Sequence, residues 1–221
     1  MTNKLISFEG VDGSGKTTLI NELKASFENK GYQIKFFQGL GSSIVGKEIR
    51  NLFLHQSKIS PKTKYLLSLA NMMQTQDELI IPALLGGYLV IVDRWYDSTF
   101  AYQSKGNYMD YDDKITSKII NHFLIKPKLT FYLDIDPKIG LKRKQTQSNH
   151  KLDLIEQKPL NYFENVRKHY LNQHKYCNDA NCKHQNCHHF LINATKSQKD
   201  NLEQVIKTLI SKKIIQINKG E

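Results

Sequence analysis

The sequence predicts an α/β protein, namely a three-layer α/β/α sandwich built on a five-stranded parallel sheet. Short apolar runs alternate along the chain with longer segments of helical periodicity. Several of these runs are continuously apolar, as expected for parallel strands that are buried on both faces. A glycine-rich segment follows the first run, at the place where such sheets bind ligands. The 221 residues fit a single domain, residues 1–221.

Five segments have the composition of strands, and they are residues 4–9, 33–37, 88–93, 129–134 and 190–193. Because helical segments separate them, we expect the strands to be parallel, with right-handed crossovers. The binding site is then expected at the carboxyl ends of the strands.

Three helical segments show apolar side chains on one face. Gly31 is expected at the C′ position that ends the first of these helices. The three apolar faces are Leu19, Ile20, Leu23 and Phe27; Ile115, Ile119, Ile120 and Phe123; and Leu202, Val205, Ile206 and Leu209.

The formal net charge of +11 would suit a nucleic acid, an anionic membrane or anionic small molecules. Only four of the 32 basic residues are arginine, and the lysines are spread along the whole chain. A nucleic-acid module usually clusters its charge and relies on arginine forks. We therefore expect small anionic ligands and no nucleic-acid partner.

Neither a signal peptide nor a membrane-spanning segment is recognised in the sequence, which predicts a soluble cytoplasmic protein. No signal peptide is visible at the first residues. The longest mostly apolar run, residues 80–92, is too short to span a bilayer and contains Pro82, Gly86 and Gly87. No membrane partner is therefore expected.

Residues 10–17 fit the phosphate-binding pattern G-x-x-x-x-G-K-[ST] between a predicted strand and a predicted helix. This pattern indicates the fold class of a P-loop NTPase. Lys16 is expected to reach the β- and γ-phosphates of ATP, and the Thr17 hydroxyl is expected to bind Mg²⁺. The predicted nucleotide-binding residues are Gly10, Val11, Asp12, Gly13, Ser14, Gly15, Lys16, Thr17 and Thr18.

A P-loop alone does not distinguish a GTPase, a motor ATPase and a small-molecule kinase. The Asn-Lys-x-Asp motif of signalling GTPases is absent from the sequence. A motor or helicase needs further motifs and usually a longer chain. A small-molecule kinase needs an acceptor pocket and a lid, and the rest of the sequence offers candidates for both.

Residues 93–103, DRWYDSTFAYQ, resemble the acceptor-binding motif of bacterial thymidylate kinases. The resemblance extends over most of the chain, from the EGVDG form of the P-loop to residues 193–196. It implies transfer of the γ-phosphate of ATP to dTMP, with Lys16, Arg94 and Arg143 as catalytic residues. A short lid is expected at about residues 143–156, and a homodimer is expected.

The resemblance also implies roles for the acceptor-binding residues. Arg94 would hold the 5′-phosphate, although a structural ion pair with Asp93 is the alternative. Gln103 would read the base edge, and Asp12 would meet the 3′-hydroxyl. The full set of acceptor-binding residues is Asp12, Arg50, Met72, Arg94, Ser98, Tyr102 and Gln103.

Three features depart from the family pattern. The turn at residues 38–42 lacks the usual Pro-Gly-Gly, and Leu154 stands where a lid arginine is expected. Met72 stands where an arginine that reads thymine is expected, so Asn71 or Gln74 could read a base edge instead. The alternatives to a dTMP kinase are therefore a kinase for another deoxynucleotide or deoxynucleoside. A P-loop ATPase acting on nucleic acid is a further alternative.

A Cys/His-rich insertion is expected at about residues 176–189. Cys177, Cys182 and Cys187 could hold a structural Zn²⁺, although their spacing lacks the usual C-x₂-C. A polar surface loop is the other interpretation.

Overall fold

Five parallel strands form one sheet in the order β2-β3-β1-β4-β5. The structure is a computed structural model that describes residues 4–106, 113–146, 153–178 and 188–216. The strands are β1 (Leu5–Gly10), β2 (Ile34–Gln38), β3 (Leu89–Asp93), β4 (Leu129–Asp134) and β5 (His188–Asn193). All five predicted strands are confirmed, with boundaries that differ by no more than two residues.

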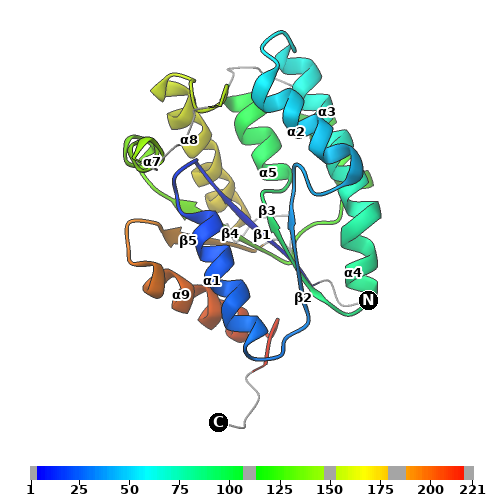
Figure 1. Cartoon of the computed structure of the whole chain (residues 1–221), viewed down its shortest axis with the longest axis vertical. Coiled ribbons are helices and arrows are strands. Elements are labelled where there is room, and N and C mark those ends of the chain that lie inside the picture. The colour runs from blue at the N-terminus through cyan, green and yellow to red at the C-terminus, as the bar shows by residue number, and fades with distance from the viewer. Residues whose placement is uncertain (1–3, 107–112, 147–152, 179–187, 217–221) are drawn as a thin grey trace.

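Helices cover both faces of this sheet. Figure 1 shows α1 and α9 on one face and α3, α5 and α8 on the other, so the three-layer α/β/α sandwich is confirmed. The helical elements, with η for π-helical segments, are α1 (Lys16–Glu28), α2 (Ile44–His55), α3 (Pro61–Thr75), η1 (Gln76–Ile80), α4 (Ile81–Leu85), α5 (Tyr96–Ser98), η2 (Thr99–Lys105), α6 (Asp113–Phe123), α7 (Pro137–Gln145), α8 (Leu160–Cys177) and α9 (Gln198–Ser211).

Helix α1 ends in the way that the sequence predicts. Gly31 has a φ of +70°, its N–H donates to Glu28 O at 3.1 Å, and Tyr32 N–H donates to Phe27 O at 3.2 Å. These two bonds form a Schellman motif with Gly31 at C′. The helix thereby stops with Leu23 and Phe27 buried against the sheet.

The other two predicted helical faces differ in how far they are covered. In α9, Val205 and Leu209 are fully buried, as expected. In α6, Ile120 is buried, but Ile115 is 58% exposed and Phe123 is 53% exposed. The apolar side of α6 is therefore wider than the surface that this chain alone packs against it.

The strand register places the site. Phe8 of β1 pairs with Asp93 of β3, and Gly10 pairs with Leu133 of β4. The P-loop therefore leaves β1 between the carboxyl ends of its two neighbours, where open α/β sheets bind ligands.

Parts of two predicted segments lie outside the described residues. These are residues 147–152 of the expected lid and residues 179–187 of the Cys/His-rich insertion. In the described part of the chain, no helix combines the length and the apolar character needed to cross a membrane.

Candidate active site

A cavity of about 810 Å³ opens at the carboxyl ends of the strands. This volume lies within the usual range for small-molecule sites. The cavity collects most of the predicted site residues, which are Asp12, Gly13, Gly15, Lys16, Thr17, Thr18, Arg50, Met72, Arg94, Ser98, Tyr102, Gln103 and Arg143. Most of the residues that the sequence analysis proposed for the site thus lie around one cavity.

The P-loop is held against α7 by two glycines. Gly13 has a φ of +76°, and a Cβ atom at this position would lie 1.9 Å from Gly140 O. A Cβ at Gly140 would in turn lie 2.5 Å from Asp12 O. Neither position has room for a side chain, so the loop and α7 pack against each other backbone to backbone. The sequence analysis did not single out Gly140.

Three predicted nucleotide-binding residues, Gly10, Val11 and Ser14, make contacts within the protein itself. Val11 is 1% exposed, and its side chain packs in the core. Gly10 O and the Ser14 hydroxyl accept hydrogen bonds from Lys16. The Val11 side chain therefore belongs to the core, and the prediction that Val11 binds the nucleotide concerns its backbone alone.

Lys16 lies folded back on its own loop. Its Nζ donates to Gly10 O at 2.8 Å and to Val11 O at 3.1 Å, and the residue is 6% exposed. Burial and the neighbouring Arg94 cation lower the pKa of Lys16 to about 8. These carbonyls hold the ammonium group within the loop, from where it can turn toward a bound phosphate.

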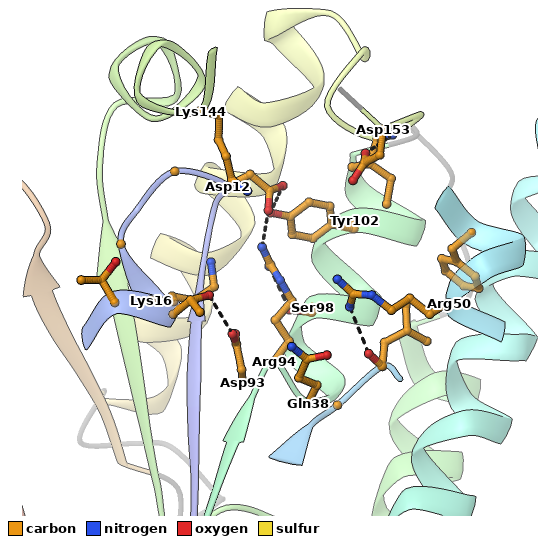
Figure 2. A pocket seen from close by; sticks show the side chains of 18 of the residues that line it. Asp12, Lys16, Gln38, Arg50, Asp93, Arg94, Ser98, Tyr102, Lys144 and Asp153 are labelled. Atoms are coloured by element: carbon orange, nitrogen blue, oxygen red, sulfur yellow. Dashed lines mark hydrogen bonds and ion pairs between the residues drawn. The ribbon is translucent and has the colours of Figure 1, made fainter. Parts of the chain in front are cut away.

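Arg94 turns back over the P-loop from the end of β3. Its Nη2 lies 2.6 Å from Asp12 Oδ1, its Nη1 donates to Gly10 O at 2.9 Å, and its guanidinium lies 4.7 Å from the Tyr102 ring centre (Figure 2). The sequence left a structural ion pair between Arg94 and Asp93 as the alternative to phosphate binding. In the structure, the ion-pair partner of Arg94 is Asp12. The fork therefore points into the cavity.

Asp12 lines the cavity and lies between two donors. The Tyr102 hydroxyl donates to Asp12 Oδ2 at 2.9 Å, and Arg94 binds the other oxygen. Burial alone would raise the pKa of Asp12, but Arg94 and Lys16 outweigh it and lower that pKa. Asp12 is therefore an acceptor that stays ionised near neutral pH.

One end of the cavity is lined by side chains from α2, α3 and η2. The Arg50 guanidinium points into it and donates to Leu40 O at 3.1 Å (Figure 2). Met72 is 3% exposed, and its sulfur accepts from the Thr99 hydroxyl at 3.7 Å. Gln103 lies beside them on η2, a π-helical segment of the kind that often occurs at functional sites.

The suggestion that Asn71 or Gln74 reads a base edge is wrong. Asn71 is fully buried, and its amide donates to Gly39 O in the turn after β2. Gln74 is exposed and donates to Glu78 at 3.1 Å. The helical period turns both side chains away from the cavity, which Met72 and Ser68 of α3 line instead.

The opposite end of the cavity lies beyond the P-loop, against α7 and the segment after β5. Arg143 in the last turn of α7 donates from Nη1 to Ala194 O at 3.1 Å. Lys196, Ser197 and Gln198 complete this wall. The sequence analysis included Lys196 in the resemblance but gave none of these three residues a role in the site.

A model of the family described as thymidylate kinase matches residues 8–206. The chain belongs to the thymidylate kinase family. The recognition made from residues 93–103 is therefore confirmed.

Three curated relatives illustrate the similarity, and each is named thymidylate kinase. The protein from Geobacillus sp. (strain WCH70) is 36% identical over 176 residues, which cover 77% of this chain and 82% of that protein. The protein from Thermosipho africanus is 33% identical over 211 residues, covering 94% of this chain and 97% of that protein. The protein from Acholeplasma laidlawii is 36% identical over 170 residues, covering 75% and 82%.

Membership of this kinase family implies the use of ATP and Mg²⁺. Thr17 and Asp93 provide oxygen atoms that fit this ion. The Thr17 hydroxyl lies 3.3 Å from Asp93 Oδ2, and Asp93 Oδ1 is buried without a hydrogen-bond partner among the described residues. The sequence analysis predicted Thr17 and missed Asp93, which it treated only as a partner of Arg94.

The zinc expectation has no support in the kinase. Cys177 is half-buried at the end of α8, whereas Cys182 and Cys187 lie outside the described residues. Within the described ranges, no three His, Cys, Asp or Glu side chains are grouped as a metal site requires.

Proposed function

We propose that this kinase transfers the γ-phosphoryl group of ATP to dTMP, giving ADP and dTDP. One observation carries the proposal: Arg94, a fork suited to phosphate, faces the same cavity as the P-loop. A kinase of nucleoside monophosphates needs one cationic site for each of its two phosphorylated substrates. Membership of the thymidylate kinase family supports dTMP as the acceptor.

The two ends of the cavity suggest how the substrates are divided. ATP would place its phosphates on the P-loop and its base toward Lys196–Gln198, where Arg143 also lies. The acceptor would occupy the end with Arg50, Met72 and Gln103. In this arrangement Arg94 and Ser98 lie below the acceptor phosphate, and Asp12 and Tyr102 lie beside the sugar.

The chemistry would depend on positioning and electrostatics. The acceptor's phosphate oxygen is already anionic, so the transfer needs no strong general base. Lys16 and Arg143 would neutralise charge on the transferring group, and Arg94 would keep the attacking oxygen in line. Thr17 and Asp93 would hold Mg²⁺, which would supply positive charge near the phosphates of ATP.

We also propose that the kinase is a homodimer that works in the cytoplasm. Support for a dimer comes from exposed apolar side chains on α3 and α6, two helices linked by a hydrogen bond between Tyr65 and Thr116. Leu66 of α3 is 61% exposed, and Ile115 and Phe123 of α6 are exposed as well. An apolar face of this kind usually marks an interface. Sedimentation of a Phe123→Glu variant should give monomers where the unmodified chain gives dimers.

The function is tested by measuring ADP release from Mg²⁺·ATP with a panel of acceptors. The panel contains dTMP, dUMP, the other monophosphates and thymidine. Turnover that is fastest with dTMP supports the proposal. Turnover that is fastest with another monophosphate keeps the mechanism and changes the substrate. Turnover with thymidine alone contradicts the role of Arg94 as a phosphate clamp.

A further inference from the structure

Arg94 has an unfavourable backbone conformation. Its φ is +67°, in the left-handed region that residues other than glycine seldom adopt. Such a conformation persists only where the surroundings fix it, and it often marks a functional site. The contacts that fix this residue therefore determine where its guanidinium points.

The backbone on both sides of this bend is bound to the end of β1. Arg94 N–H donates to Phe8 O at 2.9 Å, and Trp95 N–H donates to Glu9 Oε1 at 2.6 Å. The turn after β2 also packs against this bend, since a Cβ at Gly39 would lie 1.8 Å from Arg94 O. The Glu9 carboxyl group is the only side chain among these anchors.

Glu9 is fully buried and makes two further contacts near Arg94. Its Oε2 accepts from the Ser98 hydroxyl at 2.5 Å and from the Tyr170 hydroxyl at 3.0 Å. The Ser98 hydroxyl also lies 3.4 Å from Arg94 Nη1. One carboxyl group thus holds the backbone immediately after Arg94 and a hydroxyl under its guanidinium.

Burying a carboxyl group is unfavourable, and an apolar side chain would suit the interior end of a strand better. This cost is explained if Glu9 has a local task. We propose that Glu9 is a positioning residue that aims the Arg94 fork at the acceptor phosphate by holding Trp95 N–H and the Ser98 hydroxyl. The proposal rests on the proposed function, in which Arg94 binds that phosphate.

The length of the side chain is central to this role. Glu9→Asp keeps the carboxyl group but shortens the side chain by one carbon–carbon bond, about 1.5 Å, so it cannot reach both partners. Glu9→Gln keeps the length and the oxygen that accepts from Trp95 N–H. Positioning therefore predicts that Glu9→Asp is the more damaging change, whereas a role of charge predicts the reverse order.

The experiment uses the monophosphate that the unmodified chain turns over fastest. Glu9→Asp should raise the KM for this acceptor about ten-fold and leave the KM for ATP within about two-fold. Glu9→Gln should stay within about three-fold of the unmodified chain in both constants. The control is Ser7→Ala, which removes a buried hydroxyl of the same strand, bonded to Thr130 at 2.8 Å, and should change stability only.

A second measurement tests whether Glu9 acts through Arg94. In an Arg94→Lys background, the loss of kcat/KM from Glu9→Asp should fall to less than about two-fold. An equal loss of kcat/KM in both backgrounds overturns the proposal. A Glu9→Gln variant with a higher acceptor KM than Glu9→Asp also overturns it. If Glu9→Asp does not fold, an acceptor KM raised about ten-fold in Glu9→Gln still overturns it. Failure of the unmodified chain with every monophosphate would contradict the proposed function itself.

Discussion

Arg94 and Asp12 form an ion pair in the wall of the cavity, with Arg94 Nη2 2.6 Å from Asp12 Oδ1. The two side chains are 24% and 21% exposed, so both remain accessible from the cavity. The pair keeps the fork extended before any substrate arrives. Under the proposed function, an acceptor phosphate would replace Asp12 as the partner of the guanidinium, and Asp12 would then accept from a sugar hydroxyl.

Replacing Arg94 by lysine should damage acceptor use far more than ATP binding. Lysine keeps the charge but loses the two parallel N–H groups that match a phosphate. We expect Arg94→Lys to lower kcat/KM for dTMP about 100-fold, or about 2.7 kcal/mol, with the KM for ATP within about two-fold. Steady-state kinetics with each substrate varied in turn measures both effects.

The matched control for this change is Arg167→Lys. Arg167 also binds a carboxylate through two N–H groups, to Asp134 at 2.7 and 2.8 Å, but it does not line the cavity. The Arg167→Lys change should lower the stability of the protein and leave kcat/KM nearly unchanged. Equal losses in the two variants would show that the Arg94 effect is structural.

The sequence predicted those parts of the fold that depend on local patterns. Short apolar runs predicted all five strands of the described residues, and the P-loop glycines predicted a phosphate site that lines the cavity. It did not predict the role of Glu9 or Gly140, because each acts through a contact with a segment far along the chain. The Asn71 prediction was wrong for a related reason, since its true partner is the turn after β2.

Gly140 should be needed for ATP binding although it lies outside the P-loop. Alanine favours a helix, but its Cβ would lie 2.5 Å from Asp12 O and push α7 from the loop. We expect Gly140→Ala to raise the KM for ATP at least about five-fold and to lower the free energy of unfolding by about 1–3 kcal/mol. The control is Lys138→Ala, at an exposed position of the same helix. Unchanged ATP kinetics in Gly140→Ala would contradict the coupling between α7 and the loop.

Two glutamines at opposite ends of the cavity distinguish its two proposed subsites. Gln103 lies at the acceptor end, and Gln198 lies at the ATP end against Gly15. Each leucine variant removes hydrogen bonds worth about 1 kcal/mol, or about five-fold in KM. Gln103→Leu should raise the KM for dTMP alone, and Gln198→Leu should raise the KM for ATP alone. The opposite pattern would reverse the assignment of the two ends.

The stability of the kinase should fall as the pH rises toward 8, because of two buried carboxyl groups. Burial, together with the neighbouring Asp97, raises the pKa of Glu9 from 4.5 to about 8, and burial raises the pKa of Asp97 to about 7. Arg94 and Tyr170 also face Glu9, and the pKa of Glu9 remains raised in spite of these contacts. Between the unfolded and folded pKa values, the native state therefore holds protons that the unfolded chain releases. Unfolding becomes easier by at most about 1.4 kcal/mol per pH unit for each group.

Glu9→Gln isolates one of these two groups, since an amide does not titrate in this range. Urea unfolding at about pH 5.5 and about pH 7.5 should show a smaller loss of stability in Glu9→Gln than in the unmodified chain. The control is Glu203→Gln, which removes an exposed carboxyl group on α9 and should keep the full loss. If Glu9→Gln loses as much stability as the unmodified chain over this interval, the Glu9 carboxyl group is already ionised in the folded protein. In that case, the three hydrogen-bond donors to this carboxyl group lower its pKa by more than burial raises it.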